Sequence, residues 1–188
     1  SSLQERLAIP LVELLVPLLK TLDSDVQKGL LEQVLVLAKW DKKLNLFEIC
    51  LYSLLKQSFS EVLPDRSSHS IKKINVVAYE FNCIVSSLIH NTGSAETEKQ
   101  ALHQRMLNVF TMKQGALIAE KELSAKKIYL TLKKLSALSP MLKRSLMDVC
   151  GDIVLHDGIV RAQEYQALKL MSLVLTCPMP ALPLTTNT

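Results

Sequence analysis

The apolar positions of this chain recur at the three- and four-residue spacing of amphipathic helices along most of its length. The clearest stretch spans residues 71–88, where the apolar side chains share one helical face. They are Ile71, Ile74, Val77, Ala78, Phe81, Ile84, Val85 and Leu88. No convincing strand pattern appears anywhere. The pattern predicts an all-α protein, a helical bundle of about seven to eight helices.

Prolines and capping residues set the expected ends of the first helices. A Leu-rich helix, or a pair of short helices, covers residues 3–20, with Pro10 and Pro17 breaking or starting turns. Ser24 opens the second helix. Gln27 stands three residues after it, which is the spacing of a capping box.

A second capping box opens the third helix, with Asn45 at the cap and Glu48 three residues on. The polar stretch 60–70 is the best candidate boundary between subregions. Further helices are expected at 71–88, from Ser94 to Phe110, and at 124–135, 140–156 and 161–175. We therefore divide the chain into subregions 1–60, 61–123 and 124–188, packed as one compact domain.

Two segments match when the chain is shifted by 116 residues, which lays 22–55 on 138–171 without a gap. Asp41 then falls on Asp157, and Glu48 on Glu164. In each copy an aspartate ends one helix and a glutamate begins the next, as in two antiparallel helices around a tight loop. The offset is far from the ~40-residue period of HEAT-type solenoids. We predict a duplicated helix–loop–helix hairpin flanking a different middle section.

Composition agrees with a globular helical chain: 48% of the 188 residues are hydrophobic, 21% are charged and only 5 are glycine. The most apolar stretch, 7–19, is interrupted by Pro10, Glu13 and Pro17 and is shorter than the ~20 residues that span a bilayer. The chain starts at Ser1 without a signal peptide pattern. We expect a soluble, processed or cloned segment of a larger protein.

The four cysteines, Cys50, Cys83, Cys150 and Cys177, are scattered and form no C-x-x-C pair. Most lie in apolar helical surroundings, where a reduced thiol behaves as a small hydrophobe. We expect structural thiols in a reducing compartment. The net charge of +4 is spread along the chain and does not indicate a nucleic-acid partner.

Motifs for catalysis are lacking. The sequence contains no His-Glu-x-x-His, Gly-rich phosphate loop or Gly-x-Ser-x-Gly. Its histidines (His69, His90, His103 and His156) have no ligand three or four residues away in a metal motif. We therefore predict no enzyme activity, no catalytic residue and no bound cofactor for this chain.

The four carboxylates of the two hairpins, Asp41, Glu48, Asp157 and Glu164, are candidates for a calcium or magnesium site, since these cations prefer oxygen ligands. Neither loop has the alternating Asp/Asn ligands of an EF-hand. The alternative, which we favour, is that the glutamates satisfy helix N-termini and the aspartates close the turns.

A basic stretch follows residue 124 and holds no acidic residue up to 147. Its charged side chains are Lys126, Lys127, Lys133, Lys134, Lys143 and Arg144. The two lysine pairs are seven residues apart and share a helix face. They predict either a solvated basic face or a contact surface for anionic lipid or an acidic protein partner.

Two segments carry a family resemblance: Leu-Leu-Glu-Gln-Val-Leu-Val-Leu-Ala-Lys-Trp-Asp-Lys-Lys-Leu-Asn-Leu-Phe-Glu at 30–48, and 139–164 followed by Cys-Pro-Met-Pro at 177–180. They resemble the C-terminal helical region of bacterial membrane-bound zinc metallopeptidases related to the heat-shock peptidase HtpX. The Asp-Gly-x5-Glu hairpin at 157–164 is similar to the core of TerB-like (tellurite-resistance) helical domains. The middle section matches neither.

The resemblance implies an accessory or regulatory domain on the cytoplasmic side of the inner membrane, tethered through its parent protein. Its partner would be the upstream membrane peptidase domain, which holds the zinc ligands; none of them lies in this chain. In TerB-like domains the acidic positions are associated with metal. Asp157, Gly158 and Glu164 match that pattern, whereas Lys42 departs from it. The alternative function is a free-standing TerB-like, metal-responsive stress domain that binds calcium or magnesium.

Overall fold

The computed structural model describes residues 3–40, 45–60, 70–110 and 115–182 of the chain. These ranges hold eight α-helices: α1 (Leu3–Leu19), α2 (Ser24–Trp40), α3 (Leu46–Ser58), α4 (Ala78–His90), α5 (Glu96–Val109), α6 (Ala125–Leu135), α7 (Pro140–Val154) and α8 (Ala162–Leu175). Two 3-10 turns, Ile74–Val77 and Glu120–Glu122, complete them. The same ranges contain no strand, only a single bridge between Ile71 and Leu138. The all-α prediction is confirmed.

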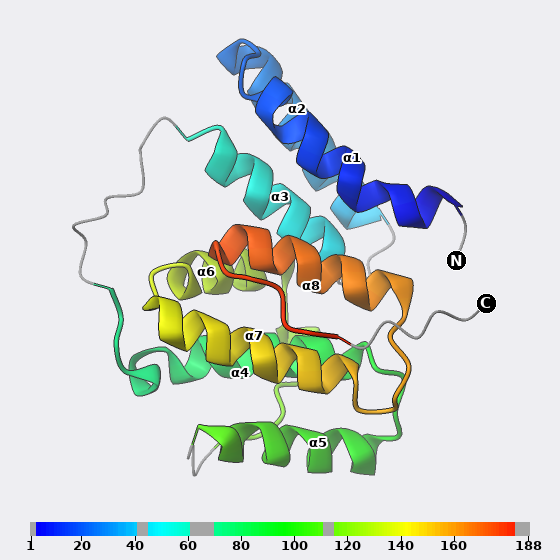
Figure 1. Cartoon of the computed structure of the whole chain (residues 1–188), viewed down its shortest axis with the longest axis vertical. Helices are drawn as coiled ribbons and strands as arrows, with labels where there is room; N and C mark the ends of the chain where they lie inside the picture. Colours follow the sequence, from blue (N-terminus) through cyan, green and yellow to red (C-terminus); the bar gives the residue numbers. More distant parts are fainter. Residues whose placement is uncertain (1–2, 41–44, 61–69, 111–114, 183–188) are drawn as a thin grey trace.

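The helices stack in layers around α4 and α8 (Figure 1). Helix α4 packs against α5, α6 and α7, and α8 packs against α3, α7 and α6. Helices α1 and α2 lie at one end, where α1 contacts α8 and α2 contacts α3. Helix α5 lies at the opposite end of the molecule. The second helices of the two predicted hairpins, α3 and α8, are thus direct neighbours.

The core is built from the apolar faces that the periodicity predicts. Helix α4 lies deepest, since every residue from 83 to 89 is buried. The largest fully buried side chains are Phe81, Ile84, Ile89, Leu107, Ile128, Leu132, Leu135, Leu146, Met147, Ile153, Leu168 and Leu170. In the described part of α1, by contrast, the only buried residue is Ile9. The stable centre of the molecule therefore lies in α3 to α8.

The predicted cap at Asn45 is confirmed by its hydrogen bond, and Ser124 caps α6 in the same way. The backbone N–H of Phe47 donates to Asn45 Oδ1 at 3.1 Å, and that of Lys127 donates to Ser124 Oγ at 3.2 Å. Each bond satisfies a donor that the first turn of a helix would otherwise leave unpaired. Pro140 opens α7, where its missing N–H costs no hydrogen bond.

The expected break in the first helix was wrong, because α1 runs through Pro10 and Pro17. Both prolines are exposed. The capping box at Ser24 was wrong as well, since Ser24 is itself the first residue of α2. Its partner Gln27 instead donates through Nε2 to the carbonyls of Leu19 and Lys20, at 3.2 Å each. The amide thus ties α2 to the carbonyl end of α1, whose last carbonyls lack helical partners.

The second hairpin turns at Gly158, which has φ +76° and so adopts the left-handed conformation that glycine tolerates best. The backbone N–H of Ile159 donates to Asp157 Oδ1 at 3.0 Å, as expected of an aspartate that closes a turn. Residues 41–44 of the first hairpin loop lie outside the described residues. The duplication of the two hairpins stays a prediction.

Within the described ranges, none of the helices combines the length and the apolar character that crossing a bilayer requires.

Candidate functional site

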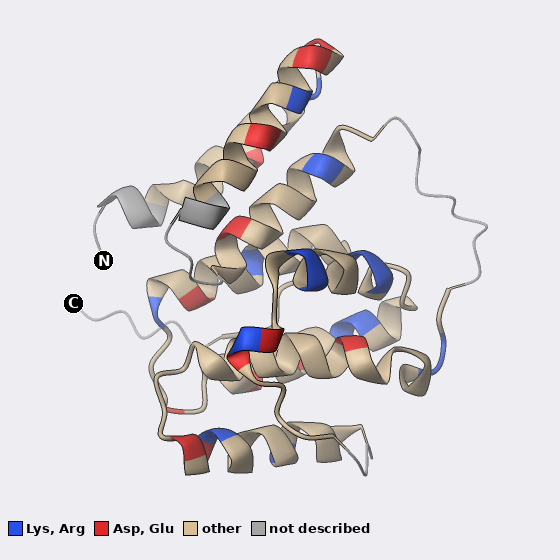
Figure 2. Cartoon of the chain, turned by 180° about the vertical axis from the view of Figure 1, so that it is seen from behind, with Lys and Arg blue, Asp and Glu red and all other residues tan. Residues whose placement is uncertain are grey.

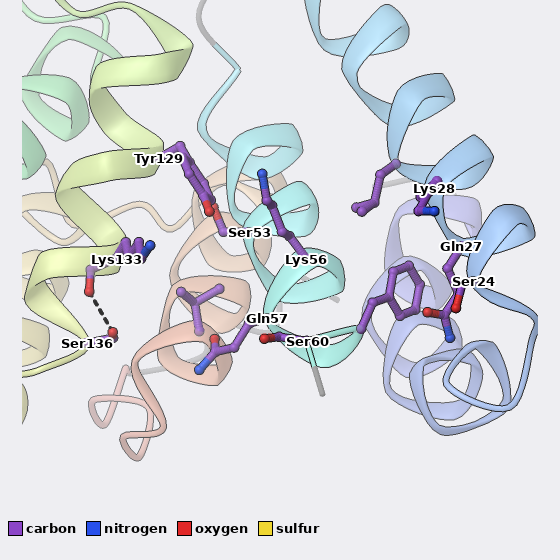
Figure 3. Close-up of a pocket in the computed structure, with 13 residues that line it drawn as sticks. Ser24, Gln27, Lys28, Ser53, Lys56, Gln57, Ser60, Tyr129, Lys133 and Ser136 are labelled. Atoms are coloured by element: carbon purple, nitrogen blue, oxygen red, sulfur yellow. Dashed lines mark hydrogen bonds between the residues drawn. The ribbon is translucent and has the colours of Figure 1, made fainter. Parts of the chain in front are cut away.

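A pocket of about 610 Å³ lies between α2, α3, α6 and α8. Three lysines line it, one each from α2, α3 and α6: Lys28, Lys56 and Lys133. In Figure 3, α6 and α2 stand on opposite sides of the pocket, with α3 between them. Among the described residues, none that lines the pocket is acidic. The pocket is therefore a concave surface of positive charge.

Lys56 is held in place by two tyrosines. Its Nζ donates to the hydroxyl oxygen of Tyr52 at 3.2 Å and lies 5.1 Å from the centre of the Tyr129 ring. The two rings pack edge to face, with their centres 5.5 Å apart. The hydrogen bond to Tyr52 raises the pKa of Lys56 above its usual range. Lys56 is thus a fixed cation at neutral pH.

The other two lysines are also exposed. Lys28 Nζ lies 3.3 Å from Asp25 Oδ1, but both side chains are largely exposed. This ion pair therefore contributes little to the stability of the fold. Within the described ranges, neither Lys56 nor Lys133 forms an ion pair. The positive charge of these lysines therefore remains available to a ligand.

The rest of the pocket wall combines apolar surface with neutral polar groups. Leu31, Phe59 and Val174 supply the apolar part, and serine and glutamine side chains supply the polar part. Ser53 is already engaged, because its hydroxyl donates to the carbonyl of Ile49 at 2.7 Å. The arrangement suits binding of an anionic group, since lysines and neutral hydrogen-bond donors share this surface.

The predicted basic stretch does not form one continuous face, and Figure 2 shows basic and acidic positions spread over several helices. Lys134 Nζ forms an ion pair with Glu80 of α4 at 2.7 Å, and Lys127 Nζ lies 6.0 Å from the Tyr79 ring. Lys143 donates to Thr176 Oγ1 at 3.3 Å, and burial lowers its pKa.

Lys126 and Arg144 are exposed elsewhere on α6 and α7. Of the six predicted contact residues, only Lys133 is among the described residues that line the pocket. Lys28 and Lys56 were missed, because each is an isolated lysine in its own helix. Nothing in their local sequence separates them from other surface lysines.

Of the four carboxylates predicted as cation ligands, three lie in the described residues. Asp41 lies outside the described residues, and Glu48 is half-buried in α3. Asp157 and Glu164 instead share Arg161, whose guanidinium lies 2.8 Å from Asp157 Oδ2 and 3.4 Å from Glu164 Oε1. A hydrogen bond from the Ile159 backbone, followed by one from Arg161, lowers the pKa of Asp157.

Glu164 also accepts a hydrogen bond from the backbone N–H of Arg161 at 2.9 Å, at the start of α8. This is the role of a glutamate that satisfies a helix N-terminus. Among the described residues, no three His, Cys, Asp or Glu side chains gather where they could hold a metal ion. Because Asp41 is outside this set, the calcium or magnesium site stays a prediction.

Replacing Glu164 with alanine is expected to lower the free energy of unfolding by about 1–2 kcal/mol, because the buried carboxylate leaves the first turn of α8 uncapped. Urea unfolding measures the loss. Gln163→Ala is the matched control, since Gln163 is exposed in the same turn. Equal stability of the two variants would contradict the capping role.

Adding excess calcium or magnesium tests the cation hypothesis. That hypothesis requires a rise in Tm that Asp157→Ala abolishes.

A second surface feature is the exposed apolar face of α1 and α2. Large apolar side chains are at least partly open to solvent along both helices and the turn between them: Leu7, Leu11, Leu14, Leu15, Leu18, Leu22, Val26, Val36 and Leu37. Leu14 and Leu18 expose 69% and 62% of their surface. Contiguous apolar patches of this kind mark interaction surfaces in folded proteins.

No family model, no curated protein and no solved structure matches this chain.

Proposed function

We propose that this chain is a non-catalytic accessory domain of a membrane zinc metallopeptidase and that it works by docking through the apolar face of α1. The exposed leucines of α1 carry the proposal. Leu7, Leu11, Leu14 and Leu18 recur every three or four residues and therefore share one stripe of the helix. Leu15 lies beside that stripe and is also exposed.

This stripe is not needed to hold the described fold together. The core lies in α3 to α8, and α1 contributes Ile9 on its inward side. Burying a leucine fully is worth about 1.5–3 kcal/mol, so each half-exposed leucine would gain roughly 1 kcal/mol on being covered. Five such side chains supply about 5 kcal/mol, which is near the lower end of the entropic cost of association between separate molecules. A partner in the same polypeptide meets a smaller cost because its effective concentration is high, so docking on the stripe would be favourable.

The partner follows from the resemblance of 30–48 and 139–164 to the C-terminal region of the HtpX-related peptidases. In that family the zinc ligands lie in a membrane-embedded part that precedes this region. The peptidase part would then precede α1 along the chain. A membrane-embedded domain is itself apolar over much of its surface, so it matches an apolar stripe better than a charged protein would. The domain would thus dock on the cytoplasmic side of its own peptidase.

The first test is the coding sequence upstream of Ser1. The proposal requires transmembrane segments and a His-Glu-x-x-His motif there. An upstream sequence that lacks both would overturn it.

The second test uses Leu14→Glu and Leu18→Glu in the full-length protein. Both side chains are exposed, so the free energy of unfolding should change by no more than about 0.5 kcal/mol. A photo-crosslinking residue at position 11 should attach to the peptidase part in the parent, and the two variants should lose this crosslink. Met141→Glu is the control, because Met141 is 80% exposed on α7. A crosslink that survives in all three variants would contradict docking through α1.

A further inference from the structure

We propose that the lysine-lined pocket between α2, α3, α6 and α8 binds a phosphate group carried on an apolar body. An anionic phospholipid headgroup and a soluble phosphate ester share this chemistry. The proposal concerns a different surface from the α1 stripe and does not depend on the peptidase assignment.

The charge of the pocket selects an anion. Lys28, Lys56 and Lys133 reach it from three separate helices, and no carboxylate is among the described residues that line it. A phosphate monoester carries about −1.5 to −2 charges at pH 7, so more than one ammonium group is needed to neutralise it. Lys28 pairs with Asp25, whose side chain is almost fully exposed. It competes only weakly for that lysine.

The side-chain types favour phosphate over carboxylate. A phosphate monoester brings about −1.5 to −2 charges to the lysines, whereas a carboxylate brings one, and the cations among the described lining residues are all lysines. Lysine binds phosphate as a point charge, with neutral donors completing the shell. Ser24, Ser60 and Gln57 supply such donors around the lysines (Figure 3).

Lys56 gives the pocket a preformed cation. The Tyr52 hydroxyl and the Tyr129 ring hold its Nζ in position before any ligand arrives. Binding therefore costs less side-chain entropy at Lys56 than it would at a freely moving surface lysine. This contact joins α3 to α6, so the fold itself positions the cation.

The apolar part of the wall indicates what the phosphate is attached to. Leu31, Phe59 and Val174 line the same space, and the pocket volume of about 610 Å³ is that of a small-molecule site. A bare phosphate ion would leave these side chains uncovered. An ester with an apolar or glycerol-like body covers them and places its charge among the lysines.

The experiment measures binding of glycerol 3-phosphate by titration calorimetry and binding to vesicles by co-sedimentation. The vesicles contain phosphatidylcholine alone or with phosphatidylglycerol. Lys56→Gln and Lys133→Gln should each weaken binding by about tenfold or more, because each removes a charged hydrogen-bond donor. Lys126→Gln is the matched control: it removes the same charge from the same helix as Lys133, outside the pocket. It should change the affinity by less than about twofold.

The two arms distinguish the source of the phosphate. Binding of the soluble ester that is lost in both pocket variants identifies a phosphate ester ligand. Binding that is confined to phosphatidylglycerol vesicles and lost in the same variants identifies a lipid headgroup. Equal effects of Lys126→Gln and Lys133→Gln would overturn the proposal, as would the absence of binding to any probe. Leu14→Glu should leave all these affinities unchanged, so the experiment tests phosphate binding independently of docking through α1.

Discussion

In the folded protein at pH 8, Cys177 is expected to react with iodoacetamide first, and Cys50 about a thousandfold more slowly than an ordinary thiol. Burial raises the pKa of Cys50 from 9.0 to about 12, so its reactive thiolate is about a thousandfold scarcer at the same pH. Burial also raises the pKa of Cys150, Cys83 and Cys177. Cys177 is only half-buried, which leaves it accessible to the reagent.

Mass spectrometry of a time course, with the modified residue identified in each peptide, measures these rates. The control is the same reaction in denaturant, where all four cysteines should react at similar rates. Rapid native labelling of Cys50 would show that the packing of α3 differs from that described. The sign of the pH effect is fixed as well: labelling of the buried thiols should rise with pH, because the thiolate is the reactive form.

The protonated state of the buried thiols argues against Cys50 and Cys150 as nucleophiles. A cysteine nucleophile needs a lowered pKa and an adjacent base, and Cys50 and Cys150 have pKa values moved in the opposite direction. Both lie in the apolar core with the leucines of α3 and α7. They behave as small core residues, as the sequence predicted from their apolar surroundings.

Local signals in the sequence were sufficient to predict most of the helices. From residue 78 onward, the apolar face predicted for 71–88 is the buried face of α4, because the spacing of side chains decides which of them share a helix face. The start of that prediction was wrong, since Ile74–Val77 form a 3-10 turn and α4 begins at Ala78. Asn45 was predicted as a cap from a single short polar side chain, and it accepts the expected backbone hydrogen bond. Such features depend on residues at most four positions apart.

Contacts between distant segments could not be predicted in the same way. Lys134 and Glu80 are 54 residues apart, and nothing near either one indicates that they pair. The pocket depends on Lys28, Lys56 and Lys133, which come together only because α2, α3 and α6 meet. The sequence therefore predicted one basic stretch. In the fold, its residues make separate contacts: an ion pair at Lys134, a ring contact at Lys127 and the pocket at Lys133.

The α1 helix illustrates a related limit. Its periodic leucines predict an apolar face, but periodicity does not determine what covers that face. In α4 the neighbouring helices cover it, whereas in α1 Leu14 and Leu18 remain exposed. The difference lies in tertiary packing. Helix α4 packs against three neighbouring helices, whereas the principal helix contact of α1 among the described residues is with α8.

Replacing Phe81 with alanine is expected to lower the free energy of unfolding by about 3–5 kcal/mol. The Phe81 side chain is completely buried in α4. Its ring meets Phe110 edge to face, with the ring centres 4.8 Å apart. Truncation therefore loses both the buried apolar surface and the ring contact, and it leaves a cavity that the surrounding helices fill only in part.

Urea unfolding followed by circular dichroism measures this loss. Val76→Ala is the control, because Val76 is 58% exposed just before α4 and its truncation should cost no more than about 0.5 kcal/mol. The position of α4 makes the comparison informative. Because α4 packs against α5, α6 and α7, a cavity at Phe81 weakens the centre that also supports the lysine pocket through α6. A loss below about 1 kcal/mol at Phe81 would mean that α4 is not the centre of the core.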